Sequence, residues 1–156
     1  MSAIAVIIII LTVALDRITK IIVESNMALH ESRVLVPGIL NITYVTNTGA
    51  AFGILKGFRW LLVAVSVIAM AAIGYFLFKC IRKKKYIIAQ IAAAFIIGGG
   101  IGNLIDRLLY ARVTDFLDLA FVNFAIFNLA DVFVCTGAGF AILSFIIYKD
   151  LMSVTE

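Results

Sequence analysis

The sequence predicts an all-α integral membrane protein with four transmembrane helices and a small extracytoplasmic β element. Of the 156 residues, 64% are hydrophobic and only 14% are charged, and the mean hydropathy is +1.16. In soluble domains about a quarter of the residues are charged, and a chain of this length has too little interior to hide so much apolar surface from water. We therefore expect lipid to be the solvent and residues 1–156 to form one polytopic domain.

Long apolar runs place the four spans at about residues 3–23, 58–80, 86–108 and 128–148. A helix needs about 20 mostly apolar residues to cross the hydrocarbon layer, and the last three runs meet this need. The first run is apolar from Ala3 to Leu15 and then carries Asp16, Arg17 and Lys20. A cleaved signal peptide has a basic start and small residues after its apolar core, so this pattern indicates a retained helix.

The cationic residues indicate how the spans are oriented. Five of the 13 lysines and arginines lie in the short connection at about residues 79–86: Lys79, Arg82, Lys83, Lys84 and Lys85. Cytoplasmic loops are enriched in such residues. We therefore expect this loop and both termini in the cytoplasm, and outer loops at about 24–57 and 109–127. A nucleic-acid surface would spread its cations along one face, so no nucleic-acid partner is expected.

The outer loops contain two candidate strands. Residues 40–44 alternate between apolar and polar side chains, which is typical of a strand with one buried face. Residues 113–121 form a second candidate with a weaker pattern. We expect both to lie at the outer membrane surface.

Four aspartates are expected near that same surface. An aspartate in hydrocarbon costs about 2.5–3.5 kcal/mol, so each one needs a structural or chemical reason. Asp16 and Asp106 come late in helices that run outward. Asp115 follows in an outer loop, and Asp131 begins a helix that runs inward. The expected topology thus brings all four to one depth.

Polar companions accompany these aspartates: Asn47 at the start of a loop of small residues, Asn103 and Arg107 around Asp106, and Asn128 before Asp131. Residues spaced three and four apart share a helix face, which is the spacing of Asn103, Asp106 and Arg107. The expected depth and the shared face together indicate one polar site at the outer border of the membrane.

Each element also has a purely structural interpretation. Asp16 and Lys20 have the spacing of an ion pair within one helix, whose lysine would reach up to the membrane interface. Asp106 can pair structurally with its neighbour Arg107. Asp118 is most simply a solvated loop carboxylate.

The spacing of Asn128 and Asp131 leaves two alternatives open. It is a fair variant of a helix capping box, and it is equally compatible with a functional acid, because ionisable residues at membrane depth are usually functional. A structural explanation is weaker for Asp115, since its nearest cation in sequence is Arg112.

Few kinds of chemistry are open to these residues. His30 is the only histidine, and its polar surroundings indicate a surface residue rather than the base of a nucleophilic triad. No spacing of His and Glu predicts a metal site, and no cofactor is expected. Two carboxyl groups that share a proton can activate water and protonate a leaving amine, although spacing alone does not say which two pair.

The polar segments resemble, in order, the motif series of the bacterial lipoprotein signal peptidases (signal peptidase II): residues 15–20, 47–52, 102–107, 113–116 and 127–131. The resemblance spans nearly the whole chain. One difference is Arg17, where the family usually has Gln.

The resemblance implies an intramembrane-type aspartic endopeptidase. It would remove the signal peptide from diacylglyceryl-modified prolipoproteins, on the N-terminal side of the lipidated cysteine, as a monomer in contact with membrane lipid. The family's catalytic aspartates correspond to Asp115 and Asp131. Its residues that bind substrate or shape the site correspond to Asn47, Asn103, Asp106, Arg107, Asn128 and Asp16. The resemblance places the site near the outer leaflet of the bacterial cytoplasmic membrane.

Two other classes of function fit parts of the sequence. A proton-coupled transporter also has intramembrane carboxylates, but it needs them near the middle of the bilayer. A scaffold that binds partner helices through Gly98 and Gly102 would use a known packing motif. It leaves the two Asn-x-x-Asp segments without a role.

Overall fold

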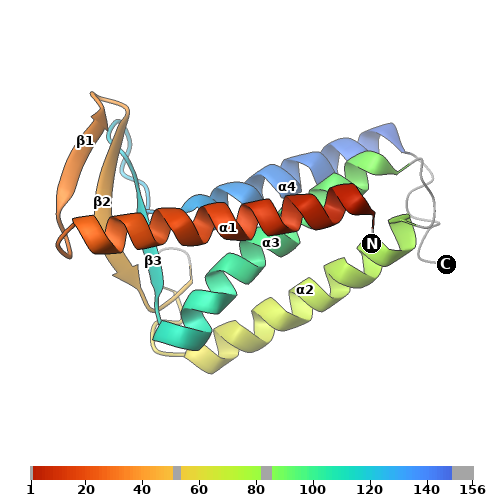
Figure 1. Cartoon of the computed structure of the whole chain (residues 1–156), viewed down its shortest axis with the longest axis horizontal. Helices are drawn as coiled ribbons and strands as arrows, with labels where there is room; N and C mark the ends of the chain where they lie inside the picture. The colour runs from red at the N-terminus through yellow and green to blue at the C-terminus, as the bar shows by residue number, and fades with distance from the viewer. Residues whose placement is uncertain (1, 51–53, 82–85, 149–156) are drawn as a thin grey trace.

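The computed structural model describes residues 2–50, 54–81 and 86–148, except for the side chain of residue 81. Four helices form a bundle with a small sheet at one end (Figure 1). The helices are α1 Ala3–Asn26, α2 Arg59–Ile81, α3 Ile87–Tyr110 and α4 Leu129–Ile147. The mostly helical architecture is confirmed.

Helices α2, α3 and α4 are long and apolar enough to cross a membrane. Helix α1 is as long, but Asp16, Arg17 and Lys20 lie in its second half, and its crossing of the membrane stays a prediction. The start of α1 and the end of α4 lie at the end of the bundle opposite the sheet (Figure 1). Most of the predicted cytoplasmic loop lies outside the described residues.

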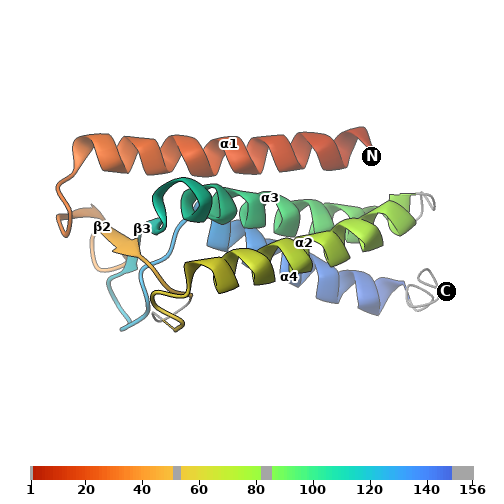
Figure 2. The ribbon, with the colours of Figure 1, turned by 90° about the horizontal axis from the view of Figure 1, so that it is seen from below.

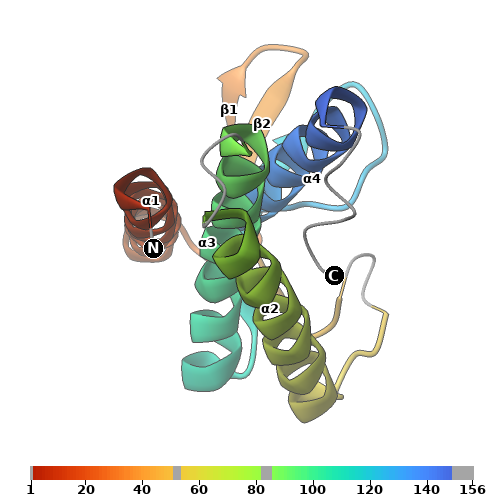
Figure 3. The ribbon, with the colours of Figure 1, turned by 90° about the vertical axis from the view of Figure 1, so that its right-hand side faces the viewer.

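Helix α3 is the centre of the bundle. It contacts α1, α2 and α4, with α1 on one side and α2 and α4 on the other (Figures 2 and 3). Glycines make this close packing possible, because a Cβ atom on Gly98 or Gly102 would overlap side chains of α1, and one on Gly99 would overlap α4. The predicted contact role of Gly98 and Gly102 is realised within the chain itself.

The sheet has three antiparallel strands in the order β1-β2-β3. They are β1 Ser32–Val36, β2 Leu40–Asn47 and β3 Val113–Leu119. The two predicted strands correspond to β2 and β3, whereas β1 was not predicted. One face of the sheet packs against the end of α1 through a cluster of Val23, Tyr44 and Phe116. The sheet thereby holds β3 beside the helix ends, which positions the site.

Candidate active site

A cavity of about 520 Å³ opens at the sheet end of the bundle. Its polar wall contains five of the predicted residues: Asn47, Asn103, Arg107, Asp115 and Asp131. Its apolar wall comes from the segment before α4 and from the first turns of α4, and includes Phe124, Ile126, Val132 and Cys135. Two carboxyl groups from different elements therefore face one mostly apolar cavity.

Asp115 enters the cavity from β3. Asp115 is only 3% exposed, and side-chain amide groups donate to both of its carboxylate oxygens. Asn128 Nδ2 donates to Oδ1 at 2.6 Å, and Asn47 Nδ2 donates to Oδ2 at 3.1 Å.

The surroundings of Asp115 favour its protonated form. Burial raises the pKa of Asp115 to about 6, and the nearby charge of Asp131 acts in the same direction. The two amide hydrogen bonds and the charge of Lys20 lower the pKa but do not cancel the effect of burial. Desolvation disfavours the charged form of any carboxyl group, so Asp115 keeps its proton up to about pH 6.

Asp131 enters from the first turn of α4, where a capping box holds it. Asn128 Oδ1 accepts from the backbone amide of Asp131 at 3.1 Å, and Asp131 Oδ2 accepts from the backbone amide of Asn128 at 3.2 Å. The other oxygen, Oδ1, accepts from Asn103 Nδ2 at 2.8 Å. The predicted cap is confirmed. The same side chain also faces the cavity.

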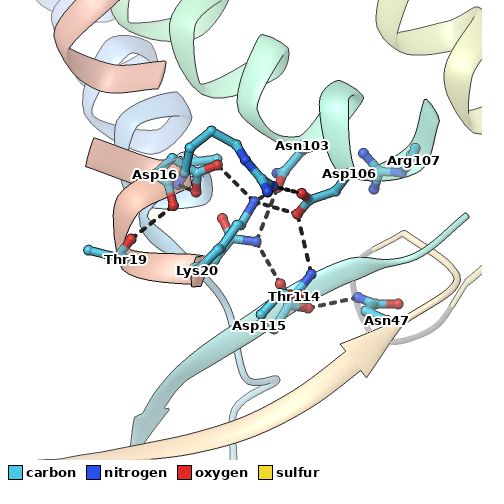
Figure 4. A network of polar contacts seen from close by, with 12 residues as sticks. Asp16, Thr19, Lys20, Asn47, Asn103, Asp106, Arg107, Thr114 and Asp115 are labelled. Atoms are coloured by element: carbon cyan, nitrogen blue, oxygen red, sulfur yellow. Dashed lines mark hydrogen bonds and ion pairs between the residues drawn. The ribbon is translucent and has the colours of Figure 1, made fainter. Parts of the chain in front are cut away.

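Behind the cavity lies a buried cluster of charges (Figure 4). Lys20 Nζ lies 2.9 Å from both Asp16 Oδ2 and Asp106 Oδ2. Arg17 also pairs with Asp106, and Asp16 Oδ1 accepts from the backbone amide of Ala130 at 3.1 Å. The cluster thus joins α1 to α3 and to the start of α4.

Two predicted pairings were wrong in detail. The ion pair of Asp16 and Lys20 exists, but Lys20 is fully buried and turns into the bundle instead of reaching the interface. Asp106 pairs with Lys20 and Arg17 of α1 rather than with its neighbour. The neighbour, Arg107, points to the cavity side, where it donates to the Gly49 carbonyl at 3.4 Å.

Asp118 is not a solvated loop residue. It lies in β3 and is half-buried, and its Oδ2 accepts from Thr43 Oγ1 at 2.7 Å. His30 is exposed, as predicted. Part of the predicted small-residue loop, residues 51–53, lies outside the described residues. Among the residues that the structure describes, no three His, Cys, Asp or Glu are grouped as a metal ion would require.

The sequence reasoning missed two parts of the site. Lys20 was treated as the partner of Asp16 alone, although it also contacts Asp106 and Asn103. The apolar cavity wall was also missed, although the apolar run from Phe124 to Phe127 in an outer loop was a usable signal, since contiguous exposed apolar patches often mark binding grooves.

Known proteins share this fold and these motifs. The family described as signal peptidase (SPase) II matches residues 8–147. A lipoprotein signal peptidase of Maridesulfovibrio salexigens is 43% identical over 148 residues, which cover 90% of this chain and 92% of the relative. One from Streptococcus pyogenes serotype M6 is 44% identical over 128 residues, covering 82% and 83%.

A solved structure is also similar to this chain in fold and sequence. It is described as a bacterial membrane enzyme at 2.3 Å resolution, and it matches with a TM-score of 0.87 and 32% identity, over 96% of this chain and 90% of that one. The family match covers most of the residues, and both relatives exceed 40% identity over more than four fifths of the chain. This chain belongs to the signal peptidase II family of membrane peptidases.

Proposed function

We propose that this chain is an aspartic endopeptidase that removes the signal peptide from diacylglyceryl-modified prolipoproteins, on the N-terminal side of the lipidated cysteine. The observation that carries the proposal is the meeting of Asp115 and Asp131 in one cavity. The two acids come from a strand and from a helix start, and each oxygen of both accepts a hydrogen bond from a protein amide. Such a fixed pair can share one proton.

The two acids have different surroundings, and this favours different roles. Asp115 is deeply buried, and burial raises its pKa to about 6, so it gives up its proton less readily than an exposed carboxyl group. Asp131 sits in the first turn of α4, where the helix N-terminus and two N–H donors stabilise a negative charge. We therefore assign Asp131 as the base and Asp115 as the acid in the resting enzyme.

The hydrolytic step then balances without a cofactor. The Asp131 carboxylate takes a proton from water as the water oxygen bonds to the scissile carbonyl carbon, and Asp115 gives its proton to the carbonyl oxygen. When the tetrahedral intermediate collapses, the C–N bond breaks, Asp131 gives its proton to the departing amine, and Asp115 recovers its own from the hydroxyl group. The products are a carboxylic acid on the signal peptide, which then loses its proton to water, and a free amine on the lipidated cysteine.

The other predicted residues would support this chemistry in two ways. Asn47 and Arg107 face the cavity, where amide and guanidinium donors can bind the substrate backbone. Asn103 and Asn128 bind the two acids. Asp16 binds the start of α4 through the Ala130 amide, and Asp106 accepts from the backbone amide of Thr114 beside Asp115. The apolar wall of the cavity suits acyl chains or the apolar part of the signal peptide.

The proposed location is the bacterial cytoplasmic membrane, with four spans and with the site near the outer leaflet. In support, the sheet and the cavity share one end of the bundle, and α2, which the cationic residues follow in the sequence, ends at the other. Cations mark the cytoplasmic side, so both termini would be cytoplasmic. We expect a monomer, because one chain supplies every residue of the proposed site.

The test is cleavage of a diacylated lipobox peptide by detergent-purified protein. Asp115→Asn and Asp131→Asn should each lower kcat/KM by at least about 10³-fold, and both variants should elute as a single species. Glu31→Gln, in the exposed pair of Glu31 with Arg33, is the control and should cleave normally. Near-normal turnover by either aspartate variant would refute the dyad, and equal cleavage of an unlipidated peptide would refute the substrate assignment.

A further inference from the structure

Lys20 begins a chain of hydrogen bonds that ends on both aspartates of the cavity. Its side chain is fully buried, and three oxygens surround Nζ: Asp16 Oδ2 at 2.9 Å, Asp106 Oδ2 at 2.9 Å and Asn103 Oδ1 at 3.0 Å. An ammonium group can only donate hydrogen bonds. It therefore requires an acceptor at each of these three positions.

This requirement determines which way the Asn103 amide faces. A primary amide has a donor side and an acceptor side, and in Asn103 the acceptor side, Oδ1, is turned to Lys20. The donor side, Nδ2, is then turned to Asp131 Oδ1 at 2.8 Å. A reversed amide would place two donors against each other at Lys20 and two acceptors against each other at Asp131.

Asn128 donates to the same Asn103 oxygen and connects it to the second aspartate. Asn128 Nδ2 donates to Asn103 Oδ1 at 3.1 Å and to Asp115 Oδ1 at 2.6 Å. Its Oδ1 accepts from the backbone amide of Asp131. Lys20 and Asn128 thus both donate to Asn103 Oδ1. With that oxygen fixed as an acceptor, each asparagine turns its amide donor to one of the two aspartates.

We propose that Lys20 is a positioning residue for the peptidase reaction, which orients the amides of Asn103 and Asn128 so that both donate to the catalytic aspartates. This inference rests on the proposed function of Asp115 and Asp131. Lys20 itself does not line the cavity, so it acts on the aspartates through the two asparagines and through its charge.

Because Lys20 is charged, its role can be tested by the pH dependence of the reaction, which a residue that only supports the fold would not change. The charged groups that act on Asp115 come from three helices: Lys20 of α1, Arg107 of α3 and Asp131 of α4. Lys20 lowers the pKa of Asp115. Its loss should therefore raise the pKa of Asp115 and move the alkaline limb of the pH–rate profile to higher pH.

The test uses a double variant that removes the cation without leaving its partner unpaired. Lys20→Met with Asp16→Asn takes away one charge of each sign, and an asparagine oxygen can still accept from the Ala130 amide. We expect kcat to fall about 10- to 100-fold with unchanged KM, and the alkaline limb to shift upward, in protein that remains folded. The matched control is Arg33→Met with Glu31→Gln, which makes the same change at an exposed ion pair and should leave kcat, KM and the pH profile unaltered.

The outcomes separate the inference from the proposed function. Parent-like kcat and pH profile in the folded double variant would overturn the role of Lys20, while the dead Asp115→Asn and Asp131→Asn enzymes would leave the dyad standing. Activity in those aspartate variants would overturn both. Lys20→Arg keeps a group that only donates and should retain kcat within about fivefold. A loss of kcat of more than about tenfold in folded Lys20→Arg protein would contradict the orienting role, and this result does not depend on the double variant.

Discussion

Asn128 and Asp131 bind each other in both directions at the start of α4, since the side chain of each accepts from the backbone amide of the other. The Asn128 side chain still has its Nδ2 group free of the cap, and that group donates to Asp115. The helix cap and the arrangement of the two acids are therefore one structure. The two interpretations left open by the Asn-x-x-Asp spacing are compatible with each other.

Substitution of Asn128 can separate the two roles. Asn128→Ser keeps a capping oxygen but loses the amide donor, whereas Asn128→Ala loses both. We expect Ala to be about 1 kcal/mol less stable than Ser, the usual value of a cap, and both to lose at least tenfold in kcat. Thermal unfolding in detergent and cleavage of the lipidated peptide measure the two effects, and an active Asn128→Ser enzyme would contradict the link to Asp115.

Most of the helical architecture could be predicted because apolar run length determines it. The strand β2 could be predicted too, because residues 40–44 alternate between apolar and polar side chains. In the structure most of its residues are half-buried and only Tyr44 is buried. The strand β1 could not: all five of its residues are exposed, so no face of it is marked by burial. It is a strand because β2 offers it hydrogen-bond partners, which is a tertiary cause that local sequence does not carry.

The candidate residues could be found from the sequence, but their partners could not. Spacing within one helix suggested Asp106 with Arg107, whereas the cations that reach Asp106 come from α1. Which cations reach Asp106 depends on how closely α1 approaches α3. This approach depends on Gly98 and Gly102, and the local sequence does not show which helix packs against them.

The close approach of α1 to α3 makes Gly98 intolerant of a methyl group. In Gly98→Ala the new Cβ would overlap Thr12 Oγ1, which already donates to carbonyl groups within its own helix. Overpacking of this kind costs about 1–3 kcal/mol. A lower Tm in detergent is therefore expected.

The matched controls are Gly74→Ala and Gly139→Ala, because nothing lies within 4 Å of a Cβ at either position. Both residues are helical, so the change should be neutral or stabilising by up to about 1 kcal/mol. Equal effects at Gly98 and Gly139 would show that the contact with Thr12 is not tight.

The raised pKa of Asp115 predicts a pH-dependent stability. Folded Asp115 keeps its proton up to about pH 6, whereas in the unfolded chain its pKa is the ordinary 3.8 of an aspartate. Between these values the folded state binds more protons, so this residue's contribution to stability falls as pH rises. The full difference is about 3 kcal/mol, because each pKa unit corresponds to about 1.4 kcal/mol.

Asp115→Asn removes this titratable group, so a comparison of the variant with the parent measures how the group contributes to stability. The free energy of unfolding of the variant, relative to that of the parent, should rise by up to about 3 kcal/mol between pH 4 and pH 7. This rise is expected whatever the difference between the two proteins is at pH 4. The measurement is the difference in Tm between the two proteins across that range. A constant difference would mean that Asp115 titrates like an exposed carboxyl group, and the assignment of Asp115 as the acid would then lose its basis.

Asp118→Asn tests whether a carboxylate of β3 must face the cavity to take part in the reaction. Asp118 is three residues from Asp115 in β3, and an odd spacing places the two side chains on opposite faces of the sheet. Its partner is Thr43, and an asparagine oxygen can accept the same hydrogen bond at a cost of about 1 kcal/mol. We therefore expect kcat/KM within about twofold of the parent and a slightly lower Tm. A tenfold loss of kcat/KM at normal Tm would mean that the acid of the reaction lies on the other face of the sheet.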